Sequence, residues 1–397
     1  MLKTIKQSFK VNFKYNIYFT KNIFEIKNSL LNKIITYENK KSPKKVIVFI
    51  DKNVSILHKK LKTDIIKYFN YYEKNIILKC HPIIISGGEK IKNHFLIIRY
   101  IYKLISKYKI CRQSFIINVG GGASLDSIGY AAATAHRGIR LIRIPTTVLS
   151  QDDSGIGVKN GINFLNKKNF IGTFSTPYAV INDYKFLTSL DNKAWISGIS
   201  EAIKVSIIKD KLFFDFIKNN TKNLVSRNMV IMKKVIFQCA KLHANHISKN
   251  GDPFEILSSR PLDFGHWSAH KIESLTKYKI SHGESVAIGI AIDSTYSYLI
   301  KLLNKEEWKS IIKTLSDLNL PIYNKILSIK KENRNIIFDG LQEFREHLGG
   351  KLTIALVKNI GYGIDIHHIN LKILEKSIDY LKKYNFFINK NKKNDYK

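Results

Sequence analysis

The first half of the chain alternates short apolar runs with longer segments in which apolar residues recur at helical spacing. Lys44–Val54, Ser114–Gly122 and Ile139–Thr147 are runs rich in β-branched residues, and each ends in turn-forming residues. Lys92–Lys107 and Ser127–Ala135 lie between them and have the helical period. This alternation predicts a parallel β-sheet wrapped by helices.

The β signal fades after about Leu190, and long amphipathic segments follow. These segments are Ala194–Lys209, Met229–Lys249, His266–Thr276 and Glu284–Leu303. The pattern predicts an α/β domain over residues 1–190 and a mainly α-helical domain over residues 191–397, with a cleft between them. We expect the lysine- and asparagine-rich C-terminal end to fray.

Composition favours an ordinary globular protein. The 397 residues are 44% hydrophobic, enough for a substantial core in two domains. The chain has no uninterrupted apolar run of the roughly 18 residues that a membrane helix needs, and its N-terminal stretch does not read as a secretory signal. We therefore expect a cytoplasmic protein without membrane contact. Cys80, Cys111 and Cys239 are too scattered to support a disulfide framework or a thiolate zinc site.

The formal net charge of +35 raises the question of nucleic-acid binding. Most of the cations are lysines spread over the whole chain, whereas base-reading and phosphate-clamping surfaces favour the arginine fork. We interpret the charge as solvated surface and expect no nucleic-acid partner. A positive field would still attract an anionic, phosphorylated small molecule.

A glycine-rich turn follows the second predicted strand. Gly120, Gly121 and Gly122 lead into a predicted helix, and such glycines let the backbone approach a pyrophosphate at the helix N-terminus. The tight turn could need the same glycines for its geometry alone, and the spacing is not the usual dinucleotide fingerprint. Further polar residues, interleaved with glycines, follow over residues 137–172, which suits a segment that closes around a ligand.

Taken together, these motifs resemble the central signature of dehydroquinate synthase and its sugar phosphate cyclase relatives. The matching stretches read GGGxxxD, RGIRLIRIPTT, DSGIGVKNGIN and KKNFIGTF, and the resemblance covers roughly residues 45–365. It implies an enzyme that uses NAD⁺ catalytically together with a divalent metal, zinc or cobalt. In that chemistry a hydroxyl is oxidised, phosphate is eliminated, the hydride returns and an aldol reaction closes a carbocycle. The first domain would bind the nucleotide, and the second the metal and substrate.

The resemblance assigns the metal to Glu201, His266 and His282. One oxygen ligand and two imidazoles would leave positions on the metal open for substrate, as a catalytic site requires. A single histidine on a helix is more often a core residue than a ligand, so the assignment depends on the order of all three. His270 lies four residues after His266, on the same helix face, where it could also bind metal. The resemblance instead gives His270 the acid–base role.

The same resemblance supplies the other candidate site residues. Those implied to hold NAD are Asp51, Asn53, Glu89, Lys92, Gly121, Gly122, Asp126, Thr146, Thr147, Asp153 and Lys168. Those implied to bind the substrate's hydroxyls and phosphate are Arg137, Lys159, Asn169 and Lys204. An arginine suits bidentate phosphate binding. Relatives are commonly dimers, so we expect a homodimer that acts on a small sugar phosphate.

One stretch departs from the family pattern. Relatives that read a substrate carboxylate offer a Lys, an Arg and an Asn, where this chain has His243, Ser259 or the displaced Arg260, and Asp263. An acid beside a substrate carboxylate would repel it. The sequence therefore predicts sedoheptulose 7-phosphate as substrate, as in relatives similar to 2-epi-5-epi-valiolone synthase and the cyclase of the Ebo cluster. The alternatives are a 3-dehydroquinate synthase that acts on the shikimate-pathway keto acid phosphate and, more remotely, a metal-dependent polyol or glycerol dehydrogenase.

Overall fold

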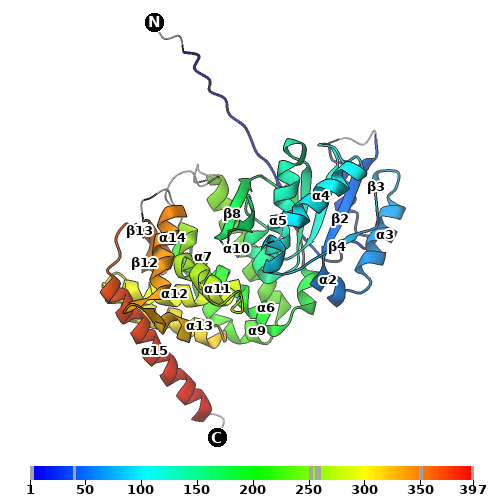
Figure 1. Ribbon diagram of the computed structural model, residues 1–397. Coiled ribbons are helices and arrows are strands. Elements are labelled where there is room, and N and C mark those ends of the chain that lie inside the picture. The colour runs from blue at the N-terminus through cyan, green and yellow to red at the C-terminus, as the bar shows by residue number, and fades with distance from the viewer. Residues whose placement is uncertain are drawn as a thin grey trace.

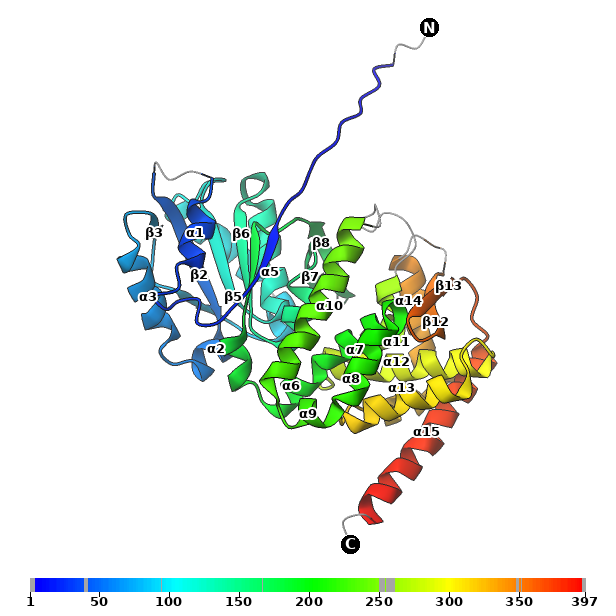
Figure 2. The same ribbon diagram turned by 180° about the vertical axis from the view of Figure 1, so that it is seen from behind.

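The computed structural model describes residues 4–38, 42–93, 95–165, 167–249, 254, 261–347, 350 and 352–394. An α/β part and a helical part lie side by side (Figures 1 and 2). The α/β part comes first in the chain, as the sequence predicts, and the fold class is confirmed. The division at residue 190 falls between the 3₁₀ helix η4 (Tyr184–Ser189) and α6 (Asn192–Ser197) and stays a prediction.

A seven-stranded parallel sheet forms the centre of the α/β part. Its strands are β1 (Asn16–Thr20), β2 (Lys44–Asp51), β3 (Ile76–Leu78), β4 (Ile83–Ile85), β5 (Phe115–Gly120), β6 (Arg140–Pro145) and β9 (Ala179–Asp183). They lie in the order β1-β9-β6-β5-β2-β3, and β4 also pairs with β2. The chain therefore adds strands to one side of β2 and then, from β5 onward, to the other side.

Helices cover both faces of this sheet. They are α1 (Leu30–Thr36), α2 (Lys52–Leu57), α3 (Leu61–Tyr71), α4 (Phe95–Lys107) and α5 (Gly122–Thr134). Successive residues of a strand point to opposite faces. Val46, Val48 and Ile50 of β2 pack with the cluster that includes α1 and α3, whereas Ile47 and Phe49 pack with α4 and α5. Burial on both faces explains why this strand is apolar at nearly every position.

An antiparallel hairpin lies over the outer surface of α5. It consists of β7 (Lys159–Phe164) and β8 (Lys167–Phe174). Ile162 of β7 joins the same apolar cluster as Ile128 of α5, so the hairpin is anchored to the α/β part. The polar motif residues of this region are thereby carried on a strand pair rather than on a free loop.

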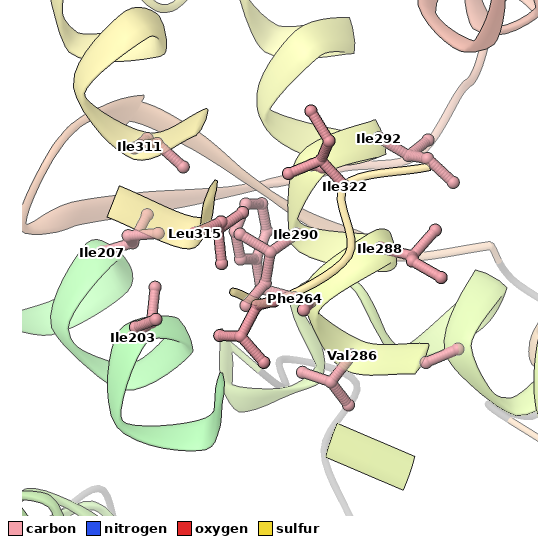
Figure 3. Packing of buried hydrophobic residues seen from close by; sticks show 14 of the residues in the cluster. Ile203, Ile207, Phe264, Val286, Ile288, Ile290, Ile292, Ile311, Leu315 and Ile322 are labelled. Atoms are coloured by element: carbon pink, nitrogen blue, oxygen red, sulfur yellow. The ribbon is translucent and has the colours of Figure 1, made fainter. Parts of the chain in front are cut away.

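The helical part packs around one helix that is buried along most of its length. Its helices are α6, α7 (Ile199–Lys209), α8 (Lys211–Asn219), α9 (Thr221–Val225), α10 (Met229–Lys249), α11 (His266–Leu275), α12 (His282–Leu299), α13 (Lys305–Asp317), α14 (Asp339–His347) and α15 (Leu371–Asn394). Two small antiparallel pairs accompany them, β10 (Lys330–Lys331) with β11 (Arg334–Asn335) and β12 (Ile354–Asn359) with β13 (Tyr362–Ile366). Figure 3 shows α12 residues such as Ile288 and Ile290 packed among side chains of α7 and α13, including Ile207 and Leu315. A helix that is apolar on all sides belongs in a core.

Two features differ from what the sequence predicts. β1 and β9, which pair with one another, are short strands that periodicity alone did not reveal. The lysine-rich end, which was expected to fray, continues α15 as far as Asn394. Extending an existing helix needs no new nucleus, so even a polar tail can follow it. In the part of the chain that the structure describes, no helix is long and apolar enough to span a bilayer.

Candidate active site

A cavity opens at the carboxyl edge of the sheet, where β2, β5 and β6 end. Many of the residues predicted to bind NAD line it together: Asp51, Asn53, Gly121, Gly122, Thr146 and Thr147. The strand order changes direction between β2 and β5, and such a switch point is where open α/β sheets bind ligands. The structure thus brings these six residues together from three separate segments of the chain.

Backbone geometry shapes this cavity. Gly121 precedes α5 as its N-cap and offers no side chain that would cap the first turn, and such a helix N-terminus favours an anion. Asp51 caps α2 by accepting a hydrogen bond from the Asn53 amide at 2.8 Å. Burial raises the pKa of Asp51. A Cβ atom on Gly87 would lie 2.3 Å from Asp51 Oδ1, so only glycine lets the neighbouring loop pass this carboxylate.

Several lining residues were missed by sequence reasoning. They are Val54, Leu57, His58, Gly88, Ala123, Ser124, Phe186, Ser189 and Leu190. His58 Nε2 lies 2.7 Å from Ser189 Oγ, and burial lowers the pKa of His58. Gly88 and Ala123 adjoin recognised motifs and could have been found from them. His58 and Ser189 lie more than a hundred residues apart and carry no local signal.

A second polar group connects η1 (Glu89–Asn93), α5 and the β7–β8 hairpin. Lys92 is almost fully buried and forms an ion pair of 2.6 Å with Asp126, and it also donates to Asn169 Oδ1. Asn163, which was not predicted, donates to Glu89 Oε1 at 3.3 Å and accepts from the Asn169 amide at 2.9 Å. Candidate residues of the cofactor set and of the substrate set therefore belong to one hydrogen-bonded network.

The three predicted metal ligands converge. One ligand atom from each of Glu201, His266 and His282 lies within 4.8 Å of the others. Glu201 Oε1 is 3.6 Å from His266 Nε2 and 3.5 Å from His282 Nε2, longer than the usual hydrogen-bond range of about 2.7–3.2 Å. Glu201 belongs to the first turn of α7, and the histidines are the first residues of α11 and α12. Three helix N-termini thus meet at one point.

Further contacts orient both imidazoles toward this point. His282 Nδ1 contacts the carboxylate of Glu273, and His266 Nδ1 lies 3.2 Å from the carbonyl oxygen of Phe264. Each contact favours the tautomer that carries its proton on Nδ1 and leaves the Nε2 lone pair toward Glu201. Carboxylate and carbonyl partners of this kind orient metal-binding histidines in known sites. The donor set and its surroundings therefore fit a divalent metal.

A close helix contact sets the start of α11. Gly265 has a φ of +77°, and a Cβ on Gly289 of α12 would lie 2.0 Å from the Gly265 carbonyl oxygen. Asp293, also on α12, accepts hydrogen bonds of 2.9 Å from the Gly265 amide and from Trp267 Nε1. These contacts hold His266, the residue between them, in place. Asp293 is therefore a positioning residue that the sequence analysis did not identify.

Each of the two carboxylates Glu201 and Asp153 lies against a basic side chain. Lys204 Nζ lies 2.5 Å from Glu201 Oε2, and both side chains are buried. Burial alone would raise the pKa of Glu201, but Lys204 and His282 lower it to about 2, so the carboxylate is ionised. His243 Nδ1 lies 3.0 Å from Asp153 Oδ1, and burial of Asp153 is outweighed by Lys204 and His243, which lower its pKa. Asp153 thus sits with the metal-site charges, and its predicted cofactor role stays a prediction.

Lys168 links the two parts of the molecule. This residue of β8 forms an ion pair with Glu273 of α11, the same carboxylate that contacts His282. Burial would lower the pKa of Lys168, but Glu273 raises it, so the lysine keeps its charge. Glu273 therefore connects Lys168 of the hairpin with the predicted metal ligand His282. Contact with the cofactor remains a prediction for Lys168.

His270 lies beside the predicted metal ligands without joining them. Its ring centroid is 5.4 Å from that of His266 and 6.0 Å from that of His282. Burial, and then the charge of Lys168, lower the pKa of His270 well below its usual range. The imidazole is therefore neutral and resists protonation, and the acid–base role of His270 stays a prediction.

Two predicted substrate residues are not brought into this group. Lys159 is exposed at the start of β7. Arg137 is exposed at the end of η2 (Ala135–Arg137), with a φ of +60°, three residues before β6 begins. Because the cavity opens at the carboxyl edge of β6, Arg137 lies toward the opposite edge of the sheet. The substrate-binding roles of both residues stay predictions.

Comparison with known proteins identifies the family. The model for the N-terminal region of 3-dehydroquinate synthase matches residues 82–197, and the model for its C-terminal region matches residues 198–339. A 3-dehydroquinate synthase of Pelagibacter ubique (strain HTCC1062) is 34% identical over 374 residues, which cover 90% of this chain and 94% of that protein. Other curated relatives that are 29–38% identical carry the same name.

Solved structures share the fold at lower identity. The structure of 2-epi-5-epi-valiolone synthase from Streptomyces hygroscopicus subsp. jinggangensis 5008, with NAD⁺ and Zn²⁺ bound, is 22% identical with a TM-score of 0.85 and covers 96% of this chain and 100% of that chain. A 2-deoxy-scyllo-inosose synthase in complex with carbaglucose-6-phosphate, NAD⁺ and Co²⁺ is 20% identical, with a TM-score of 0.71 and coverage of 91% and 95%. At such identities the likeness establishes the fold alone.

The sequence-based choice of sedoheptulose 7-phosphate is wrong, because the curated relatives carry the name 3-dehydroquinate synthase. That choice depended on the repulsion expected between Asp263 and a substrate carboxylate. In the structure, the charge of Asp263 acts on the buried cation Lys204, so it is not an unbalanced negative charge. The other positions used, Ser259 and Arg260, lie outside the described residues.

Family models together span residues 82–339, and similarity to the Pelagibacter relative extends over 90% of the chain. Glu201, His266, His282 and most of the residues that line the strand-edge cavity lie within residues 82–339. The chain is an enzyme and belongs to the 3-dehydroquinate synthase family of sugar phosphate cyclases.

Proposed function

We propose that this enzyme catalyses the 3-dehydroquinate synthase reaction. It would act on the seven-carbon keto acid phosphate of the shikimate pathway, eliminate phosphate and close the carbocycle by an intramolecular aldol reaction. The names of the curated relatives support this choice of substrate. The observation that carries the proposal is the convergence of Glu201, His266 and His282 in the same fold as the strand-edge cavity.

The cavity and the triad fit the two groups that this chemistry needs. NAD⁺ would lie at the N-terminus of α5, near Gly121, Gly122 and Asp51, and Zn²⁺ or Co²⁺ would be held by the triad. When bound, NAD⁺ supplies a reversible hydride acceptor, and the metal supplies a Lewis acid that polarises a substrate hydroxyl. Because the hydride is returned, the reaction would consume no net NAD⁺.

The chain's own residues would orient the substrate and move protons. Neutral His270, beside both metal-binding histidines, would accept a proton from the substrate and later return it. Lys204, a buried cation against Glu201, would stabilise negative charge that develops on substrate oxygens. Asn169, which belongs to the hydrogen-bonded network around Lys92, would bind a hydroxyl or phosphate group of the substrate. The three helix N-termini at the triad present a partial positive field that favours an anionic substrate.

The proposal extends to the class of substrate, the cell compartment and the oligomeric state. Its substrate would be a small sugar phosphate rather than a macromolecule, and its overall positive charge would attract such an anion. We place the enzyme in the cytoplasm as a homodimer. Sedimentation of the purified chain tests the oligomeric state independently of the chemistry.

Phosphate release tests the reaction directly. The purified chain would be loaded with Zn²⁺ or Co²⁺, given NAD⁺ at far less than the substrate concentration, and offered the keto acid phosphate or sedoheptulose 7-phosphate. We expect many phosphates per NAD⁺ with the keto acid and a lower catalytic efficiency with the ketose. Accumulation of NADH in step with product would indicate a dehydrogenase instead. Faster turnover of the ketose would overturn the substrate assignment.

A His270→Asn variant tests the proton-transfer role. Asparagine keeps hydrogen-bonding atoms but does not titrate near neutrality, so we expect phosphate release to fall by about a hundred- to ten-thousandfold while metal binding stays intact. Loss of the metal from this variant would show that His270 acts as a ligand.

A further inference from the structure

An N-terminal arm, residues 4–15, precedes β1 without regular secondary structure. Its odd-numbered positions are mostly apolar and strongly exposed: Ile5 is 86% exposed, Phe9 83%, Val11 60% and Phe13 52%. Its even-numbered positions are polar and include three lysines, Lys6, Lys10 and Lys14. Strict alternation of this kind is the pattern of a strand with one face buried.

The alternation continues in phase into β1. Tyr15, Ile17 and Phe19 follow the odd-numbered series, and there they pack against buried Ile156 and Val180. The same face that is covered at β1 is therefore uncovered in the arm. In both ribbon views the arm runs away from the body (Figures 1 and 2). β1 is the edge strand of its sheet, so the arm extends from an open edge.

The apolar surface of the arm also continues onto the β7–β8 hairpin. The Phe13 ring lies 5.4 Å from that of Phe254, and Phe254 lies 5.5 Å from Phe174, which is 44% exposed. Contiguous exposed apolar surface of this kind marks an interaction site. What covers it must supply both a strand and apolar side chains.

We propose that the arm pairs antiparallel with the same arm of a second copy of this chain, centred on Val11. In this register Phe9 lies opposite Phe13 of the partner arm, twice by symmetry, and Val11 lies opposite itself. Aromatic pairs directly opposite one another stabilise antiparallel strands. A two-fold interface of this kind is self-complementary, and most homodimers are built in this way.

The positions of the lysines exclude several other registers. With Val11 at the centre, Lys10 lies opposite Asn12 and Lys14 opposite Ser8. A centre on Lys10 or on Asn12 would instead place lysine opposite lysine, which is destabilising. A centre on Phe9 also separates the lysines, but it gives one aromatic pair, Phe9 with itself, where the centre on Val11 gives two. Sliding one arm along the other by one residue, or by any odd number, would place apolar residues of one arm opposite polar residues of the other.

Sedimentation of the full chain tests the arm as a dimer contact. Val11→Asp places two carboxylates at the symmetry axis, so we expect the dimer dissociation constant to rise by at least about a hundredfold. Asn12→Asp adds the same charge on the polar face, opposite Lys10, and should leave the dimer intact. Neither position belongs to the active site, and phosphate release reports separately on the proposed function. A monomeric wild-type chain, with an arm free for some other partner, would overturn the proposal.

Disulfide trapping tests the register itself. In a background with the exposed Cys111 changed to Ser, Val11→Cys should cross-link two copies, because directly opposed Cα atoms lie about 4.5–5.5 Å apart, within disulfide range. Phe9→Cys alone should not, since its two copies would be offset by four residues, about 14 Å. A mixture of Phe9→Cys and Phe13→Cys chains should cross-link. Absence of the Val11→Cys link, or equal linking by Phe9→Cys alone, would overturn the pairing.

Discussion

The strand-edge cavity and the metal triad are built by different means. The cavity is formed at the ends of three neighbouring strands and the start of α5, with glycines where the chain must pass closely. The triad is formed by side chains from three separate helices, and each imidazole needs a further partner, Glu273 or the Phe264 carbonyl, to orient it. The cavity therefore depends on sheet topology, whereas the triad depends on how helices pack.

The cavity and the triad also differ in how their carboxylates are stabilised. The carboxylate of Asp51 in the cavity is satisfied by a local cap. Around the triad, Glu201 pairs with Lys204 and Glu273 pairs with Lys168, all of them buried or nearly so. Removing one partner of a buried pair leaves the other uncompensated, which costs far more than the pair contributes. Substitutions at the triad should therefore have larger effects than those at the cavity.

The largest effect is expected for Glu201→Gln. The amide removes the anionic ligand and leaves Lys204 without its carboxylate. A catalytic metal contributes several kcal/mol, so phosphate release should fall by about a hundred- to a thousandfold, and metal should be lost on dialysis. Glu343→Gln, which removes only an exposed partner of Lys271, is the matched control. Full metal content in Glu201→Gln would contradict the assignment of this ligand.

A smaller effect is expected for Glu273→Gln. Glutamine can still accept from His282 but no longer carries the charge that also pairs with Lys168. Loss of such an outer partner typically weakens metal affinity by about ten- to a hundredfold. Competition for Zn²⁺ or Co²⁺ against a chelator measures this affinity. Adding Lys168→Met to Glu273→Gln should recover the stability of the fold, because the unpaired cation is removed. It should not recover the affinity for the metal. Unchanged metal affinity in the single variant would mean that other contacts orient His282.

Asp293→Asn should act mainly on stability. Asparagine keeps one acceptor for the Gly265 amide and the Trp267 indole, which both donate to Asp293. We expect urea unfolding to reveal a loss of about 1.5–3 kcal/mol, with a weaker effect on metal affinity than Glu273→Gln has. Asp317→Asn, at an exposed helix position, is the control. Equal stability of the two variants would argue against a positioning role for Asp293.

The stability difference between the wild type and Asp293→Asn should depend on pH. Burial raises the pKa of Asp293 from its usual value to about 7. A carboxyl group whose pKa rises on folding stabilises the protein fully below its unfolded pKa, near 4, and this contribution is lost as the pH rises through 7. The stability advantage of the wild type over Asp293→Asn should therefore shrink between pH 5 and pH 8. An advantage that grows with pH would contradict this ionisation behaviour.

The smallest effect is expected for Gly121→Ala in the cavity. Thr147 Cγ2, at 3.6 Å, is the nearest atom to the added Cβ, so the protein itself accommodates the methyl group. The methyl group would instead occupy space beside the first turn of α5. We expect NAD⁺ binding to weaken by roughly tenfold, about 1.4 kcal/mol, with an unchanged melting temperature. Unchanged NAD⁺ affinity would place the cofactor elsewhere in the cavity.

Local sequence determined the elements and the chemistry of this protein. Short apolar runs rich in β-branched residues predicted the inner strands of the sheet, and helical periodicity predicted the helices, because the spacing of buried positions follows from backbone geometry. The glycine run Gly120–Gly122 was recognisable in the sequence, and the family resemblance pointed to Glu201, His266 and His282, which the structure brings together. The substrate was judged wrongly because charges such as Asp263 were read without their neighbours.

Only the tertiary structure decided which residues support the site. Pairing of β1 with β9, the His58–Ser189 contact and the ion pair of Lys168 with Glu273 join segments far apart in the chain. Glu273 and Asp293 look like ordinary helix residues in sequence, since acidic side chains are common on helices. Their roles follow from burial and from the groups they face, and both properties arise only when the helices pack together.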